Sequence, residues 1–266
     1  MVRRCSHPPQ FPLFHVRTYA ILLGMNVILF ERMPEGDRIP SDDFRYGHIR
    51  NVLRLSVGDH LSIGIVDGPL GEATLTAVDP TGISFSWRQT LPASEAASMH
   101  PVTLLVAQVR PICMKRILRE AVSLGVRRLI VTGADTAEKS YRVSGLWKTG
   151  EYRKYLLDGA MQSAMTGMSD IRFADCVDAA VASLAVEDSM RFMLDNVVDG
   201  VPLSSLDIPA GKSVLAVGPE RGWTDRERGV FSTAGFQAVT LGRRVLRTET
   251  ACSAGIAVLL GRMGLL

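Results

Sequence analysis

The stretch from residue 213 to residue 261 constrains the fold more than any other part of the sequence. It holds two short apolar runs, Ser213–Val217 and residues 237–241, and each run ends at a glycine-bearing turn that leads into a helical pattern. Thr224 and Glu227 have the spacing of a capping box, so a helix is predicted to begin directly after the first turn. Neighbouring strand ends that lead into helix N-termini are where open α/β sheets bind ligands. We therefore expect a ligand site formed by two adjacent strand ends at these turns.

The chain before this stretch alternates between strand and helix patterns. Residues 102–109 and 126–132 are strand candidates on either side of a helical pattern at 112–124, and residues 152–166 form a further helical pattern. Residues 133–147 lack periodicity and are predicted to form a surface loop. The weaker patterns are strands at residues 171–174 and 191–194, a helix at 178–186 and a loop at 200–211. Such alternation predicts a mainly parallel sheet covered by helices on both faces.

The amino-terminal part of the chain has a different pattern. Short strand candidates separated by tight turns lie at residues 26–30, 60–66, 72–78 and 82–87. Ser41 or Asp42 is expected to cap a short helix that runs through Arg54. Residues 91–101 contain two prolines and small polar residues, which is typical of a linker. The pattern predicts a compact β-barrel before this linker and an α/β domain after it.

Residues 1–24 need a separate interpretation. Arg3 and Arg4 precede an apolar run, but prolines interrupt the segment and no small-residue cleavage site follows, so a signal peptide is not expected. We expect instead that residues 1–24 are a disordered extension or a misassigned start, with translation beginning at Met25. An intact mass of the native protein that included residues 1–24 would contradict a start at Met25.

Composition limits the classes of function. The 266 residues, 47% of them hydrophobic, are enough for one large or two modest domains. A net charge of +3 permits an RNA partner without requiring one. The four cysteines form no CxxC pair and no histidines have zinc-ligand spacing, so we expect no metal site and reduced, buried thiols in a cytoplasmic protein. No apolar stretch reaches the length of a membrane span.

Two motifs carry a resemblance to a known family. GPERGWTDRE at residues 218–227 and LGRRVLRTETA at residues 241–251 resemble the paired signature of the ribosomal RNA small subunit methyltransferase E family, which belongs to the SPOUT methyltransferases. Arg221 stands where the family usually has glycine, which would crowd the loop or add a cation to it. No GxGxxG, GxSxG or HExxH motif is present, so dehydrogenase and hydrolase functions lack support.

The resemblance implies an α/β fold of two parts. Residues 25–92 would form a PUA-like β-barrel that binds RNA, and residues 101–266 a SPOUT-type α/β knot, a deep trefoil, that carries the catalytic site. The implied activity is S-adenosylmethionine-dependent methylation of N3 of a uridine in the 16S rRNA of the small ribosomal subunit. The small residues of the last helix, predicted at residues 250–263, fit the homodimer that the family forms, although ordinary core packing explains them as well.

The resemblance also implies roles for particular residues. Arg247 is expected to contact RNA or to stabilise a uridinate, whereas Glu249 and Glu220 lie near the reaction or brace the loops. The residues expected to bind the cofactor are Thr132, Gly133, Val217, Gly218, Glu220, Gly222, Leu241, Gly242, Val245, Leu246 and Thr250. The residues expected to bind RNA are His48, Arg50, Arg54, Lys115, Gln162 and Arg244.

Two of these assignments leave alternatives open. Residues 48–54 resemble the family's H-x-x-x-VLR motif, and Arg50 and Arg54 would share a helix face that meets successive phosphates or is merely solvated. Around Gln162 the charged residues of the family are missing, because Met161 and Met165 stand at neighbouring places. The alternatives to the implied activity are therefore methylation of a different RNA nucleotide, or a non-catalytic RNA- or ribosome-binding protein that keeps the fold.

Overall fold

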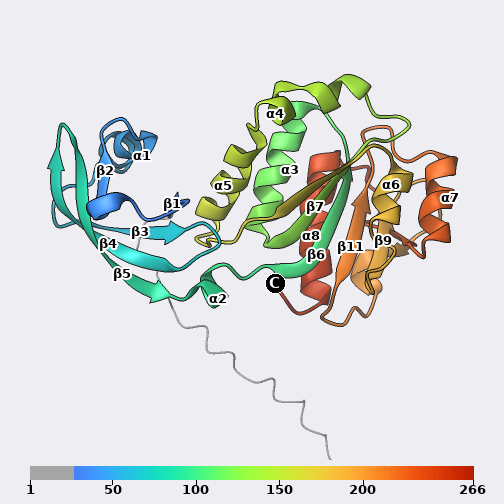
Figure 1. Cartoon of the computed structure of the whole chain (residues 1–266). Helices are drawn as coiled ribbons and strands as arrows, with labels where there is room; N and C mark the ends of the chain where they lie inside the picture. Colours follow the sequence, from blue (N-terminus) through green and yellow to red (C-terminus); the bar gives the residue numbers. More distant parts are fainter. Residues whose placement is uncertain (1–26) are drawn as a thin grey trace, which may run out of the picture.

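The computed structural model describes residues 27–266, so the predictions for residues 1–24 and for a start at Met25 lie outside it. The chain folds into two sheets (Figure 1). A five-stranded sheet has the strand order β1-β3-β4-β5-β2, and a seven-stranded sheet has the order β10-β12-β9-β11-β6-β7-β8. Figure 1 shows the smaller sheet at the blue and cyan end of the chain and the larger sheet with its helices at the other side.

The five-stranded sheet contains the four short strands that the sequence predicts and a fifth, β2, that it does not. Its strands are β1 Ile28–Phe30, β2 Arg38–Pro40, β3 His60–Ile65, β4 Leu70–Asp79 and β5 Gly82–Leu91. Only the β1–β3 pair is parallel within this sheet. Alternate strand residues such as Ile63, Leu75 and Phe85 are buried and form one core with Ile49. A 3₁₀ turn at Glu35–Asp37 precedes β2.

The predicted helix that ends at Arg54 is wrong in its cap and in its type. Asp43, and neither Ser41 nor Asp42, caps α1 Phe44–Gly47, because its carboxylate accepts the Arg45 amide at 2.8 Å. A π-helical turn, His48–Leu53, follows, and Arg54 ends it in the left-handed conformation at φ 56°. Because the turn is wider than an α-helical one and Arg54 leaves it, Arg50 and Arg54 do not share an α-helical face.

The seven-stranded sheet is parallel throughout, which confirms the prediction from the alternating pattern. Its strands are β6 His100–Ala107, β7 Val126–Thr132, β8 Asp170–Ala174, β9 Met190–Leu194, β10 Val201–Pro202, β11 Ser213–Val217 and β12 Gln237–Thr240. Every strand except the short β10 falls within a few residues of a predicted one. The predicted loop at 200–211 instead contains β10 and a 3₁₀ turn at Leu203–Ser205.

Helices cover both faces of this sheet. The longer helices are α3 Pro111–Ser123, α5 Tyr152–Gln162, α6 Val177–Ala182, α7 Asp225–Thr233 and α8 Thr248–Arg262. Alternate residues of one strand, such as Leu104 and Leu105, belong to different cores. The core that contains Leu104 packs under α3, α5 and α8, and the core that contains Leu105 packs under α6 and α7 (Figure 1).

The order of the strands corrects one expectation about the ligand site. The two strands that carry the signature turns, β11 and β12, are not adjacent, because β9 lies between them. Met193 of β9 pairs with Ala216 on one side and with Ala238 on the other. β11 itself lies between β9 and β6, which both precede it in the chain. The carboxyl ends of three strands, rather than two, therefore meet at this point.

Two connecting segments are more ordered than the sequence indicates. The predicted linker at residues 91–101 contains α2 Ala93–Ala96, whose Ala96 is fully buried, and the first residues of β6. The predicted surface loop at 133–147 contains a 3₁₀ turn, Lys139–Val143, and most of α4 Gly145–Lys148. Among the three cysteines that the structure describes, the prediction that the thiols are buried holds for Cys252, whereas Cys113 is half-buried and Cys176 is exposed. Within residues 27–266, every helix is too short or too polar to cross a lipid bilayer.

Candidate functional site

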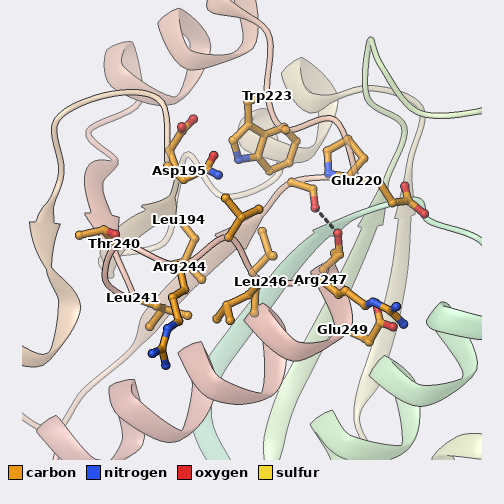
Figure 2. A pocket seen from close by; sticks show the side chains of 18 of the residues that line it. Leu194, Asp195, Glu220, Trp223, Thr240, Leu241, Arg244, Leu246, Arg247 and Glu249 are labelled. Carbon is orange, nitrogen blue, oxygen red and sulfur yellow. Dashed lines mark hydrogen bonds between the residues drawn. The ribbon is translucent and has the colours of Figure 1, made fainter.

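A cavity of 540 Å³ lies at the carboxyl ends of β9, β11 and β12 (Figure 2). We call it the main cavity. Its walls come from residues 194–196 at the end of β9, from residues 217–220, 222 and 223 at the end of β11, and from residues 240–242, 244–249 and 251 around the β12–α8 connection. Arg110 and Cys113 at the start of α3 complete the lining. The site is thus built from three loops at one edge of the sheet, with helix N-termini around them.

The loop after β11 takes its shape from one glycine and from contacts on several sides. Gly222 has φ 70°, a left-handed conformation that glycine adopts without steric cost. Its carbonyl accepts the Thr136 hydroxyl at 2.9 Å, and the Gly218 carbonyl accepts the Thr248 hydroxyl at 3.2 Å. The predicted capping box of Thr224 and Glu227 is present at the start of α7. These contacts hold the loop in one conformation before any ligand binds.

Glu227 links this loop to another part of the chain. Its side chain is completely buried and accepts the Thr224 amide and the Asp135 amide, both at 2.8 Å. The Asp135 carboxylate in turn pairs with Arg226 at 2.9 Å, and this guanidinium lowers the pKa of Asp135. The capping box therefore fastens the segment after β7 to the loop after β11.

The loop after β9 is held by a buried ion pair. Asp195 has a side chain that is only 3% exposed, and its carboxylate accepts Arg228 Nε at 2.8 Å and the Val197 amide at 2.6 Å. Hydrogen bonds to Asp195 raise the pKa of Arg228, which keeps the pair charged. Asp195 lines the main cavity (Figure 2), so the pair fixes the position of this wall.

The charged groups of the main cavity divide into paired and unpaired ones. Glu249 is nearly buried, with Arg116 Nη1 at 3.7 Å and the Cys113 sulfur at 3.6 Å from its Oε1. Burial, together with Glu249, raises the pKa of the Cys113 thiol, which therefore stays protonated at neutral pH. Arg244 and Arg247 line the cavity and are exposed, and within residues 27–266 neither forms an ion pair.

Most of the residues expected to bind the cofactor lie together in the main cavity. Those that line it are Val217, Gly218, Glu220, Gly222, Leu241, Gly242, Val245 and Leu246, and they are joined by Arg244, Arg247 and Glu249 (Figure 2). Thr250 does not line the cavity. Thr132 and Gly133 lie at the end of β7, separated from β11 by β6, and line a second cavity. Gly133 has a packing reason to be glycine, since a Cβ there would lie 2.3 Å from the Asp175 carbonyl oxygen.

The other residues expected to bind RNA do not line the main cavity. His48, Arg50 and Arg54 belong to the five-stranded sheet and its π-helical turn. Lys115 is paired with Glu151 at 2.7 Å, and this hydrogen bond raises the pKa of the lysine. Gln162 is exposed at the last residue of α5.

Three lining residues after β9 were missed by the sequence analysis. Leu194, Asp195 and Asn196 were not considered because residues 191–194 gave only a weak strand signal. The usable signal was an apolar run, residues 192–194, followed directly by two polar residues. Arg110, Cys113 and Trp223 were missed because nothing in their spacing marks them. Among residues 27–266, no group of three or more His, Cys, Asp and Glu side chains could hold a metal ion.

The chain is similar in sequence to known RNA methyltransferases. The RNA methyltransferase domain family matches residues 96–260. The ribosomal RNA small subunit methyltransferase E of Treponema pallidum is 33% identical over 243 residues, covering 89% of this chain and 91% of that protein. The ribosomal RNA small subunit methyltransferase E 1 of Borreliella burgdorferi is 26% identical, covering 86% of this chain and 94% of that protein. The similarity therefore extends over most of the chain and not only over its motifs.

A solved structure has the same fold. It is the crystal structure of a ribosomal RNA small subunit methyltransferase E from Neisseria gonorrhoeae bound to S-adenosyl methionine. It superposes with a TM-score of 0.74 at 23% identity and covers 90% of this chain and 98% of that one.

Proposed function

This chain belongs to the ribosomal RNA small subunit methyltransferase E family, and we propose that it transfers a methyl group from S-adenosylmethionine to N3 of a uridine in 16S rRNA. The observation that carries the proposal is the main cavity, because the two signature loops form its walls and three exposed arginines, Arg110, Arg244 and Arg247, line it without an ion pair among the described residues. The cofactor-bound relative from Neisseria gonorrhoeae, with the same fold, supports the choice of cofactor.

The residues of the main cavity fit S-adenosylmethionine. A volume of 540 Å³ lies in the usual range for sites of small organic ligands. Leu194, Leu241 and Leu246 offer an apolar surface for an adenine ring, and the glycine-bearing loops offer backbone amides and carbonyls. When bound, the cofactor supplies an electrophilic methyl group on a sulfonium. The protein has no covalent chemistry to perform and has to hold the nucleophile in line and exclude water.

Methylation at N3 of uridine also requires that the ring proton leaves. A cation near the base favours the uridinate, and Arg247 is the unpaired cation that the signature places next to α8 (Figure 2). Glu249 is engaged by Arg116 and Cys113, which favours a role in bracing α3 against α8. Glu220 is exposed and lines the cavity, and its one hydrogen bond is a long one of 3.4 Å from the Arg110 amide. Glu220 is thus the better-placed proton acceptor.

The same proposal extends to the architecture. Residues 101–266 would form the knotted catalytic domain, which is supported by the position of β11 between two strands that precede it. Residues 25–92 would form a PUA-like barrel that binds RNA, supported by the exposed Arg50 and Arg54. A homodimer would use α8, where Ala254 and Ala257 are partly exposed. Gly255 is excluded from that role, because a Cβ there would lie 2.9 Å from Leu194 and Leu215 of its own chain.

The test is methyl transfer from labelled S-adenosylmethionine to small ribosomal subunits isolated from a strain that lacks this gene, with nucleoside mass spectrometry of the product. N3-methyluridine is the expected product. A different methylated nucleoside would support a methyltransferase that acts on another nucleotide, in line with the altered residues around Gln162. RNA binding without any transfer would favour the non-catalytic alternative.

A further inference from the structure

The second cavity, of 320 Å³, lies at the carboxyl ends of β6, β7 and β8. We call it the aromatic cavity, because Trp147, Tyr152 and Phe173 line it together with Thr132 and Arg142. It is a close neighbour of the main cavity along the sheet edge. Gln108 lines the aromatic cavity and Arg110, two residues later in the same segment, lines the main cavity.

The three aromatic rings form one cluster. The ring centroids of Trp147 and Phe173 are 5.1 Å apart in an edge-to-face arrangement, and those of Tyr152 and Phe173 are 6.1 Å apart. Phe173 lies on the edge strand β8 and is 56% exposed. The Trp147 indole nitrogen is buried and has no hydrogen-bond partner among the described residues. A flat ligand placed in the cavity against Phe173 would remove the half-exposed ring from water.

The polar groups around these rings suit a nucleobase. Gln108 and Thr132 are almost completely buried, and their donors are engaged by the Val109 and Gly133 carbonyls, each at 3.0 Å. The Gln108 amide oxygen and the Thr132 hydroxyl oxygen remain as acceptors for the N–H groups of a base. Arg142 is exposed and pairs with the exposed Asp175, so the local charge is largely balanced there. Lys148 and Arg153 directly follow two of the aromatic residues and are exposed, which provides cations for a phosphate backbone.

We propose that the aromatic cavity binds one unstacked base of the RNA strand that carries the target nucleotide. Proteins recognise single-stranded RNA by stacking splayed bases on aromatic side chains and by hydrogen bonds to the base edges. The volume lies at the lower end of the range for small-ligand sites, which suits one base. Since the main cavity is the neighbouring site, a base held here would lie close to the target nucleotide in the chain. This inference rests on the proposed function, because that function identifies the bound strand as RNA.

A direct test uses photochemical cross-linking. The full-length protein is mixed with a short oligouridylate that carries one 5-iodouridine, irradiated, and digested for peptide mass spectrometry. The expected cross-links fall on Trp147, Tyr152 or Phe173. If the oligonucleotide binds and its cross-links at every iodouridine position avoid these three residues, the inference is overturned.

Variants of Phe173 separate stacking from apolar packing. Phe173→Ala is expected to weaken oligouridylate binding about tenfold, since stacking on one ring contributes on the order of 1–3 kcal/mol per base. Phe173→Leu should weaken it similarly, whereas Phe173→Tyr should keep it. Val186→Ala is the control, because Val186 is 96% exposed and lies away from both cavities. Equal binding by Phe173→Ala and the wild type would contradict the proposed stacking.

The outcomes distinguish this inference from the proposed function. Affinity for S-adenosylmethionine should be unchanged in every Phe173 variant, because Phe173 does not line the main cavity. Wild-type methyl transfer with the same RNA KM in Phe173→Ala would leave the function standing and remove the inference. Absence of methyl transfer by the wild-type protein would contradict the proposed function. The cross-linking result would still decide whether a base binds in the aromatic cavity.

Discussion

Arg244 and Arg247 line the main cavity and have no carboxylate partner among residues 27–266. Arg226 and Arg228, close by on α7, are both held in ion pairs. An arginine that is already paired gains little from an anionic substrate, whereas an unpaired one at a cavity contributes its full charge. Arg244 and Arg247 of the signature loop, together with Arg110, are therefore the cations that the main cavity offers to an RNA substrate.

Arg247→Ala should lower the rate of methyl transfer by about 10²–10³-fold, the effect of removing one charge-stabilising group from an active site. Affinity for S-adenosylmethionine should change by less than about threefold, because Arg247 is expected to act on the base. Single-turnover methyl transfer and calorimetric cofactor binding measure the two effects. The matched control is Arg243→Ala, since Arg243 is an exposed arginine of the same loop that does not line the main cavity. Parallel losses of rate and affinity would make Arg247 a structural residue.

Arg221 departs from the family motif, which usually has glycine at this position. The sequence suggests that an arginine in place of the family glycine crowds the cofactor loop or adds a cation. Its side chain is exposed and lines neither cavity, and its φ is not left-handed. The left-handed residue of this turn is Gly222, which is retained. The backbone requirement of the motif is therefore met, and a crowded cavity is not observed.

At the scale of elements, the capping box starts α7 and also joins two segments that are far apart in the sequence. Thr224 and Glu227 were predicted from their spacing alone, since a capping box is a local pattern. The hydrogen bond from the Asp135 amide to Glu227 was not predictable, because it joins segments far apart in the sequence. The position of β9 between β11 and β12 was missed for the same reason, since periodicity reports which residues form strands and not which strands pair.

Glu227→Gln should destabilise the fold by about 1–3 kcal/mol, because an amide nitrogen would then face one of the two backbone donors and leave it unsatisfied. Urea unfolding followed by circular dichroism measures the loss. Glu95→Gln is the control, as Glu95 is an exposed carboxylate of α2. Equal midpoints for the two variants would show that the buried carboxylate is not needed.

The burial of His100, at the start of β6, predicts that the stability of the fold depends on pH. Its amide donates to the Gly125 carbonyl at 2.8 Å, and burial lowers the pKa of its imidazole. The unfolded histidine, with a pKa of about 6.5, takes up a proton before the folded one as pH falls. The free energy of unfolding should therefore fall from about pH 7 to pH 5, and less steeply in His100→Gln. Denaturant titrations at several pH values measure both slopes, and identical slopes would contradict the assignment to His100.

At the scale of the whole molecule, one buried threonine joins the two sheets. Thr166 follows α5, and its hydroxyl donates to the Gly68 carbonyl at 2.6 Å. Its carbonyl accepts the Asp67 amide and its amide donates to the Ala96 carbonyl, both at 2.8 Å. The sequence analysis assigned this residue to a helix, and nothing local indicated that it contacts the β3–β4 turn. Contacts of this kind depend on tertiary placement, which single-sequence patterns do not contain.

Thr166→Val should cost about 1–3 kcal/mol, since it keeps the shape of the side chain but leaves a buried carbonyl without its donor. The loss should appear first as faster proteolysis of the segment between the sheets, because local opening needs less energy than global unfolding. Thr166→Ser retains the hydroxyl and serves as the control. Wild-type protease resistance in Thr166→Val would show that the hydrogen bond does not hold the sheets together.

The order of the strands has a consequence during synthesis. Within the seven-stranded sheet, β6, β7 and β8 are synthesised first. One edge of β6 stays unpaired until β11 has been synthesised, since Ser213 of β11 pairs with Val102. Until then one edge of the nascent three-stranded sheet has unpaired backbone groups and exposed apolar side chains, and such an edge is prone to pair with other chains. The loops of the main cavity are complete only once Ala251 has been added. The nascent protein therefore has an unpaired, aggregation-prone sheet edge between the synthesis of β8 and that of β11, and it acquires its cofactor site as nearly the last step.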